Sequence, residues 1–445
     1  MMTWIVSMSA MASLPTSAEI PVIPSNPQDV SRDPVSIYPP PAKNPEVEQP
    51  APVQPPSLDS VGQRPLFADL EARKWLAEKG VTLAGRITLQ PAANFGGYKG
   101  NGFSLVHQSN FSAAFDLERL GVVPGGTFKI GLTDRLGDSV NVNRTGSLIF
   151  TQGFYGQSES VRLSELSYEQ ILLDKKLAIK VGFAPMGADF GKLPYICNLM
   201  NSGICGHALG PTYSSGWRND PTGQWGVRVK WTSKSGWYLQ AGAYDVTPIR
   251  ITPGHGFYLG FEGVTGAYFP IEAGYSWGKS PSDYAGTIRV GAYYDTSKAP
   301  LLGRPSAFVK GRSGLILQGA QQLWKPEANT VRGIAVFGVF TIADKASGLI
   351  RRNYEIGASW RGMLASRPDD IASIGWVRLN VNDHVNDGAL LSQRRTNEQM
   401  FEVNYGFQVA PWLIARTVLN YNIRPGGYPG RQNAFMVAAH IQATL

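Results

Sequence analysis

Hydrophobic residues alternate with polar or small residues through most of the chain after residue 80. In the segment 176–184, Leu177, Ile179, Val181 and Phe183 occupy every second position. Because residues two apart lie on one face of a β-strand, this period predicts strands with one apolar face and one polar face. The alternating segments are about 10–15 residues long, whereas a strand of a soluble protein usually has 5–6 residues. A tilted strand that crosses a membrane needs this length.

Two classes of protein fit this pattern, a soluble β-protein and a membrane barrel. No run of 18 or more apolar residues is present, which excludes a membrane-spanning helix. A hydrophobic fraction of 43% suits either class. Trp and Tyr recur near the ends of the segments, as an interfacial girdle requires, and they include Trp225, Trp231, Trp237, Tyr244, Trp277, Tyr294, Trp360, Trp412 and Tyr421.

The connections between segments alternate in length, which is typical of bacterial outer-membrane barrels. The short connections include 173–175, 233–235 and 410, and the long ones are 137–157, 185–222, 246–265, 296–311 and 383–397. Counting 258–263 as a strand would break this alternation, so we assign it to a long loop. An even number of strands then remains, as a chain with both ends in the periplasm requires.

The sequence therefore predicts an all-β fold, a sixteen-stranded antiparallel transmembrane β-barrel with a short N-terminal helix. Sixteen strands leave a water-filled lumen, whereas eight would be filled by side chains. The predicted strands are 81–91, 104–118, 126–136, 158–172, 176–184, 223–233, 236–245, 266–277, 285–295, 312–324, 331–342, 353–362, 371–382, 398–409, 411–422 and 433–445.

The first 60 residues have a different character from the rest. Residues 1–13 contain a short apolar run and an Ala-Met-Ala triplet, and we expect a remnant of a signal peptide there. Residues 14–60 are rich in proline and are expected to form a disordered linker, because they cannot bury enough apolar surface to fold. The barrel domain is expected over 61–445, beginning with a helix at 66–79 that Gly80 can terminate.

The net charge is +8 over the whole chain, and residues 1–60 are acidic, so the barrel domain carries the positive excess. A basic surface can contact nucleic acid, anionic lipid or anionic solutes. No run of basic residues marks a nucleic-acid site, so we favour outer-membrane lipid, lipopolysaccharide and solutes as partners.

Motifs of enzymes are weak in this chain. Residues 274–278 (GYSWG) match the nucleophile elbow of hydrolases, but the next residues predict a turn and a strand where that elbow needs a helix. Residues 278–280 (GKS) resemble the end of a phosphate loop whose first glycine is here Ala273. The five histidines fall in no metal-spaced pair. We therefore expect no enzyme, no metal and no cofactor.

The two cysteines, Cys197 and Cys205, stand eight residues apart in the long connection 185–222. In an oxidising compartment they could close a small disulfide, whereas two thiols alone are a poor metal site. We expect the disulfide if the protein is exported.

Several motifs resemble the carbohydrate-selective porins of the OprB type. They are spread over about residues 62–445 and are found at 166–190, 197–206 (CNLMNSGICG), 214–231 (SSGWRNDPTGQWGVRVKW), 236–248, 269–275, 290–297 and 404–413. The resemblance implies a passive, sixteen-stranded outer-membrane channel for glucose and similar sugars. Two departures concern targeting. The last residue is Leu445 where such barrels usually end in an aromatic residue, and the signal segment lacks a basic start.

A sugar channel needs hydrogen-bonding groups and a flat apolar surface, and its binding must stay weak to permit flux. We expect the connection 185–222 to fold into the lumen and narrow the pore. Its polar contacts would come from Arg218, Asn219 and Asp220. The residues of the wall that we expect to line the pore are Arg228, Lys230, Arg289, Tyr293, Trp376, Arg378, Glu402, Asn404 and Arg416. Trp376 or Tyr293 would stack on the sugar ring.

Three other functions fit parts of the pattern. The excess of inward arginine suits a general or anion-selective porin without a sugar site. An outer-membrane hydrolase would need a partner for Ser276, and none is evident. A soluble carbohydrate-binding β-sandwich is disfavoured by the strand lengths. The expected location is the bacterial outer membrane with the N-terminus in the periplasm, as a monomer or a homotrimer.

Overall fold

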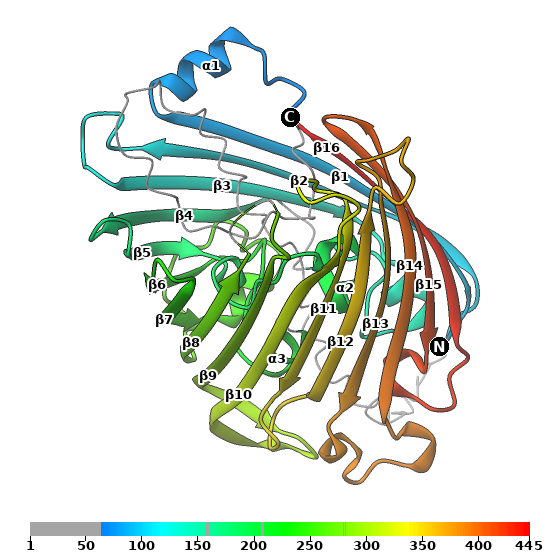
Figure 1. The fold of residues 1–445 in the computed structure, drawn as a ribbon. Coiled ribbons are helices and arrows are strands. Elements are labelled where there is room, and N and C mark those ends of the chain that lie inside the picture. The colour runs from blue at the N-terminus through cyan, green and yellow to red at the C-terminus, as the bar shows by residue number, and fades with distance from the viewer. Residues whose placement is uncertain (1–63, 157–160, 206–208, 279, 281) are drawn as a thin grey trace, which may run out of the picture.

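The computed structural model describes residues 64–156, 161–205, 209–278, 280 and 282–445. The expected signal remnant and linker, 1–13 and 14–60, lie outside these residues. Within them, sixteen antiparallel strands close into one barrel in which each strand pairs with the next along the chain (Figure 1). The last strand pairs with the first, with Arg86 opposite Thr444, so the sheet has no free edge.

The predicted number of strands is confirmed, and most bounds agree within a few residues. The strands are β1 (Val81–Gly96), β2 (Gly102–Asp116), β3 (Gly126–Gly137), β4 (Val161–Leu172), β5 (Leu177–Ala184), β6 (Gln224–Thr232), β7 (Trp237–Val246), β8 (Gly266–Trp277), β9 (Gly286–Leu301), β10 (Arg304–Trp324), β11 (Gly333–Ile342), β12 (Ile350–Arg361), β13 (Ile371–Val381), β14 (Asn397–Ala410), β15 (Leu413–Ile423) and β16 (Ala434–Thr444).

The connections define two ends of the barrel. The long ones, 138–160, 185–223, 247–265 and 382–396, all follow odd-numbered strands and lie at what we call the loop end. Most connections after even-numbered strands are short and form the turn end. Residues 258–263 contain no strand, as predicted.

One long connection is absent, and the prediction of a loop at 296–311 is wrong. The strands β9 and β10 continue through this stretch and leave only Leu302 and Gly303 between them. Here Ser297 and Ala299 are buried, while Lys298 and Pro300 are exposed, so the two-residue period persists beyond its apolar part. Because the outward residues of this extension are polar, hydrophobic alternation alone did not predict it.

The N-terminal helix α1 (Glu71–Glu78) is shorter than the predicted 66–79, because residues 66–69 form a turn. It lies beside the barrel at the turn end, close to the C-terminus (Figure 1). Arg73 fixes it there by donating hydrogen bonds of 2.7 Å to the backbone oxygens of Leu83 and Leu445. None of the helices in the described part of the chain is both long and apolar enough to span a bilayer.

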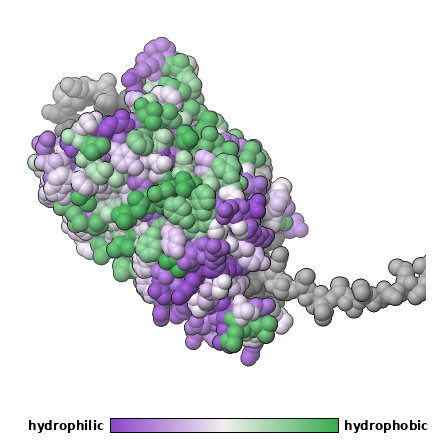
Figure 2. All heavy atoms as spheres, turned by 90° about the vertical axis from the view of Figure 1, so that its right-hand side faces the viewer, coloured by the Kyte–Doolittle hydropathy of each residue, from purple (hydrophilic) through white to green (hydrophobic). Residues whose placement is uncertain are grey.

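The outer face of the barrel is apolar and exposed. On β14, for example, Phe401, Val403 and Phe407 are exposed, while the alternate Glu402 and Asn404 are buried. Figure 2 shows hydrophobic side chains spread over the middle of one outer face, with hydrophilic side chains gathered toward the lower end. This arrangement is the reverse of a soluble sandwich, whose apolar faces meet inside.

Candidate functional site

The described residues of the connection between β5 and β6, 185–205 and 209–223, lie inside the barrel, and we call this connection the inserted loop. It carries two short helices, α2 (Ser202–Cys205) and α3 (Leu209–Ser214), which Figure 1 shows within the ring of strands. Its apolar side chains form a hydrophobic cluster with the inner faces of β11–β14, and the members include Tyr195, Ile196, Leu199, Ile204, Leu209, Phe337, Val339, Val377, Leu379 and Met400. These residues of the loop are therefore packed against β11–β14, whereas its Met186, Phe190 and Trp217 pack in a second cluster with inward residues of β7–β10.

The inserted loop contains the two cysteines, and a disulfide joins Cys197 to Cys205. The bridge spans eight residues and precedes the segment 206–208, which lies outside the described residues. Because it joins two points of the inserted loop, it restricts the loop without linking it covalently to the wall.

Wall carboxylates hold the loop at three points. Glu402 accepts hydrogen bonds from the backbone N–H groups of Met200 (2.6 Å) and Asn201 (2.9 Å). Glu272 accepts one from the backbone N–H of Gly191 at 2.7 Å. Asp295 does the same for the N–H of Gly216 at 2.7 Å. Hydrogen bonds from N–H groups to a buried charge are strong, so these carboxylates fix the position of the loop. A fourth carboxylate, Glu398, similarly binds the N–H groups of Leu148 and Ile149 in the connection 138–160.

Three predicted pore residues also serve the inserted loop. Asn404 donates to the backbone oxygen of Asn198 at 2.9 Å, and Arg416 donates to that of Cys197 at 3.3 Å. Arg289 donates to the backbone oxygen of Lys192. All three lie on the inner face, and their contacts position the loop, which limits their freedom to bind a passing sugar.

The predicted loop residues Arg218, Asn219 and Asp220 are buried. The Asn219 side-chain oxygen accepts the indole N–H of Trp217 at 2.7 Å, and Asp220 forms an ion pair with Arg135 at 3.4 Å. Burial, together with the nearby guanidinium of Arg312, lowers the pKa of Arg218 to about 10, against the opposing effect of Asp295. These side chains thus hold the end of the loop in place.

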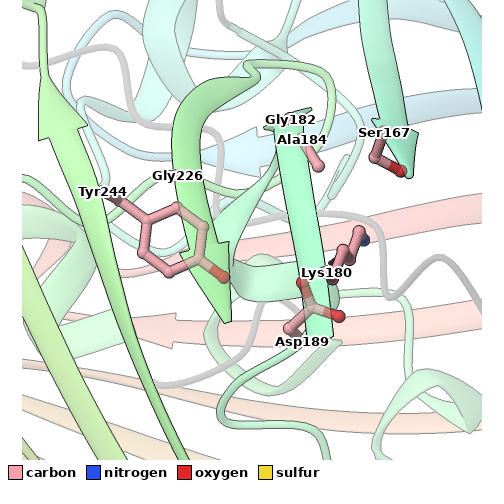
Figure 3. A pocket seen from close by; sticks show the side chains of 7 residues that line it. All are labelled: Ser167, Lys180, Gly182, Ala184, Asp189, Gly226 and Tyr244. Atoms are coloured by element: carbon pink, nitrogen blue, oxygen red, sulfur yellow. Dashed lines mark ion pairs between the residues drawn. The ribbon is translucent and has the colours of Figure 1, made fainter. Parts of the chain in front are cut away.

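A network of ion pairs joins the start of the loop to β4–β6. Lys180 lies 3.1 Å from Glu165 and 3.2 Å from Asp189, and Arg228 lies 2.8 Å from Glu169 and 3.8 Å from Asp189. Figure 3 shows the small pocket beside it, lined by Lys180, Asp189 and Tyr244 among others. Burial raises the pKa of the Asp189 carboxyl, but the cations around it outweigh burial, so its pKa lies below the ordinary value.

A tyrosine lies against the wall beside this network. The inward-facing Tyr238 on β7 is half-buried, and its ring lies on Gly274 of β8, where a Cβ atom would approach the ring to 2.3 Å. The Nζ of Lys230 is 5.0 Å from the ring centroid, and the guanidinium of Arg289 is 5.8 Å from it. The Tyr238 hydroxyl donates to Glu272 at 2.7 Å. The arrangement offers a flat aromatic surface with cations beside it.

The predicted inward orientation of Trp376 and Arg378 is wrong. On β13 the buried, inward residues are Ser373, Val377 and Leu379, and Trp376 lies on the outer face. The Trp376 ring centroid is 6.4 Å from that of the outward-facing Phe401. The inner face of β13 is apolar because it contacts the inserted loop and not water. The rule that polar residues face the lumen therefore selects the wrong face of this strand.

Tyr293 faces inward but cannot stack on a sugar, because only 4% of it is exposed. Its ring is stacked on Tyr268 with centroids 5.0 Å apart, and Tyr268 in turn contacts Trp217 of the inserted loop. Tyr293 is thus part of the packing that supports the loop.

Sequence reasoning missed Tyr238, Lys180, Glu165, Glu169 and Asp189. The first four stand at inward positions of β4, β5 and β7, so alternation alone could have included them. Asp189 lies in the inserted loop, and nothing in its local sequence shows which cations it meets.

Comparisons with known proteins agree with this geometry. A model of the family described as "Carbohydrate-selective porin, OprB family" matches residues 100–445. Porin B of Pseudomonas aeruginosa is 29% identical over 407 residues, which cover 84% of this chain and 89% of that protein. The putative porin QuiX of Acinetobacter baylyi is 27% identical over 385 residues, with 80% and 87% covered.

A solved structure is similar over nearly the whole barrel. The high-pH structure of OprB from Pseudomonas putida has a TM-score of 0.78 at 28% identity, and the match covers 84% of this chain and 96% of that one. The family match extends over more than three quarters of the sequence, from β2 to the C-terminus, and includes the inserted loop and its anchors. The chain therefore belongs to the OprB family of carbohydrate-selective porins.

Proposed function

We propose that this chain is a passive channel of the bacterial outer membrane through which small carbohydrates such as glucose diffuse. The family match supports sugar selectivity, and the closed sixteen-stranded barrel supports diffusion through a pore. The N-terminus would lie in the periplasm, which places the loop end outside the cell. The inserted loop would narrow the pore, because it fills the side of the lumen next to β11–β13.

The pathway for the sugar would run along the opposite side, past β4–β8. That side carries the ion-pair network and Tyr238 beside the packing of Met186, Phe190 and Trp217, whereas the larger apolar cluster covers the β11–β13 side. The side chains of Glu165 and Glu169 are 25% and 24% exposed and can accept hydrogen bonds from hydroxyl groups, while the buried cations that pair with them keep the net field small. An uncharged, polar solute suits such a wall better than an ion does.

Tyr238 would be the surface on which the sugar ring stacks, in place of the outward-facing Trp376 and the buried Tyr293. Its ring rests on Gly274 and the side chain is only half-buried, which would leave part of the ring open to the lumen. The long side chain of Lys230 can swing from the ring to a sugar hydroxyl. The single observation that carries this assignment is that Tyr238 is half-buried while Tyr293 is almost fully buried.

Current through single channels in a planar bilayer tests the sugar site. With wild-type protein, glucose or maltose should reduce the current in a concentration-dependent way. Tyr238→Ala should raise the half-blocking concentration by about tenfold, because the stacking surface is lost. Tyr238→Phe keeps the ring and loses only the bond to Glu272, so its half-blocking concentration should stay within about twofold of wild type.

The alternative is a general or anion-selective porin with no sugar site. In that case sugars would reduce the current only in proportion to solution viscosity, equally in wild type and both variants. Reversal potentials measured in a salt gradient are the second test, because they report the ion selectivity of the channel. The paired charges predict weak ion selectivity, whereas strong anion selectivity would favour the alternative. Whether the barrel is a monomer or a homotrimer stays a prediction, which size measurement in detergent can test.

A further inference from the structure

Four basic side chains lie on the outer face of the barrel near the loop end. They are Lys298 on β9, Lys310 on β10, Arg352 on β12 and Arg378 on β13. Lys298, Lys310 and Arg352 are exposed. Arg378 is half-buried, and it faces outward because its neighbours in the sequence, Val377 and Leu379, are buried and face inward. We call these four side chains the outer basic row. None of them contributes to the sugar pathway.

The two lysines stand directly opposite each other in the antiparallel pair β9–β10. Like charges at opposite positions destabilise a sheet. The Nζ of Lys298 lies 4.1 Å from the ring centroid of Phe308, and no carboxylate among the described residues pairs with either lysine. A bound anion would remove this repulsion.

The two arginines are diagonal neighbours on β12 and β13. Arg352 is opposite Asn380, and Arg378 is opposite Tyr354, so the two positions are about 7–8 Å apart. Arg378 donates to the side-chain oxygen of Asn380 at 2.8 Å. The outward residues around the two arginines are uncharged, among them Phe340, Ile342, Tyr354, Asn380 and Gln399.

Aromatic side chains fix the height of the outer basic row relative to a membrane. The rings of Tyr354 and Phe340 are tilted against each other with centroids 5.2 Å apart, and Trp376 lies near Phe401. Outward aromatic residues mark the boundary between acyl chains and headgroups. Arg352 and Arg378 each lie two residues beyond an aromatic residue toward the loop end, and Lys298 lies four residues beyond Tyr294. Arg352 and Arg378 therefore stand at headgroup height, and the two lysines lie beyond Tyr294, the last outward aromatic residue of β9 toward the loop end.

We propose that the outer basic row binds the phosphate groups of lipopolysaccharide in the outer leaflet. Lysine and arginine form charge-assisted hydrogen bonds to phosphate, and the apolar strands below accept the acyl chains. A second copy of the chain fits less well, because a symmetric contact would bring the same cations together. The proposed lipopolysaccharide site requires only that the barrel lies in the outer membrane with its loop end outside the cell. It does not depend on the route that sugars take through the pore.

Native mass spectrometry of the full chain in detergent tests this site, with diphosphoryl lipid A as the probe. The variants are Lys298→Gln/Lys310→Gln and Arg352→Gln/Arg378→Gln. The control is Lys175→Gln/Lys176→Gln, which removes two exposed lysines at the turn end. We expect each test pair to weaken lipid A binding by about tenfold, because two phosphate contacts are lost. The control should bind as wild type does.

Two further measurements separate the contribution of the phosphates to lipid A binding from that of the acyl chains. Lipid A without phosphates should bind wild type as weakly as the variants do, and millimolar inorganic phosphate should not displace intact lipid A, because the acyl chains contribute. Equal binding of intact lipid A by wild type and both test pairs would overturn the proposal. The proposal would also be overturned if the control pair weakened lipid A binding as much as the test pairs do. A change in the number of protomers in the particle, with lipid A binding unaltered, would overturn it as well. Unaltered conductance of each variant would show that the barrel is folded.

Discussion

At the scale of single residues, Glu402 shows how the wall positions the pore. Its carboxylate receives two backbone N–H groups of the inserted loop and the side-chain amide of Asn201. We predicted that Glu402 would bind sugar hydroxyls, but its contacts are with the loop. Its inward position followed from alternation, whereas its partner could not be foreseen, since Met200 lies about 200 residues away.

Replacing Glu402 should release the loop while leaving the barrel closed. Glu402→Ala leaves the N–H groups of Met200 and Asn201 buried without an acceptor, at a cost of about 1–3 kcal/mol for each. We expect amide exchange around 199–202 to become faster and single-channel conductance to rise and grow noisier. Glu402→Gln keeps one carbonyl oxygen and should give a smaller effect. Unchanged exchange in Glu402→Ala would contradict the anchoring role.

Asp189 gives the site a defined dependence on pH. Its pKa in the folded protein lies below the ordinary value, so the ion pairs stabilise the fold above the pKa of the unfolded chain, about 3.9. That stabilisation is lost only as pH falls through the lower, folded pKa. We expect conductance to stay constant from pH 7 to about pH 4 and to change below it.

Asp189→Asn serves as the matched variant for this titration. It removes the carboxylate between Lys180 and Arg228 and should alter conductance already at neutral pH. If wild-type conductance instead titrated with a midpoint above about pH 5, and the variant abolished that step, the assigned direction of the pKa shift would be wrong.

At the scale of elements, the inserted loop depends on its disulfide as well as on its anchors. A bridge across eight residues stabilises the loop by about 2–3 kcal/mol through reduced chain entropy. Cys197→Ser/Cys205→Ser should therefore speed amide exchange within 196–205. The thermal unfolding of the barrel should change little, since no strand is linked by the bridge. A large fall in the unfolding temperature would show that the loop supports the wall.

Strands were predicted better than loops for a physical reason. A strand with lipid on one side shows its apolar period in its own sequence, so all sixteen could be marked. The extension of β9 and β10 was missed because Lys298 and Lys310 replace apolar residues on the outer face. Where a strand passes beyond the acyl chains, the outer face no longer needs to be hydrophobic.

At the scale of the whole molecule, closure joins β1 to β16 across most of the length of the chain. Arg73 of α1 binds the backbone at this seam, through Leu83 of β1 and through Leu445, which directly follows β16. Arg73 thus supplies a polar contact to the last residue of the chain.

Arg73→Ala should loosen the seam at the turn end only. We expect faster amide exchange at Leu445, whose N–H donates to the backbone oxygen of Gly85, and a modest loss of thermal stability, while the number of strands and the conductance stay as in wild type. Arg73→Lys can keep one of the two bonds and should give an intermediate result. Exchange that is unchanged in Arg73→Ala would mean that strand pairing alone holds the seam.

The sequence by itself determined the number of strands, their direction and, for most of them, the face that meets lipid. These properties depend on a period of two residues, which each strand carries locally. The tertiary structure alone decided which inner residues meet water and which meet the inserted loop. Val377, Leu379 and Tyr293 are covered by a segment far away in the chain, whereas Tyr238 is only half-buried. The surroundings of an inward side chain depend on which segment of the chain packs against it, and the local two-residue period carries no information about that segment.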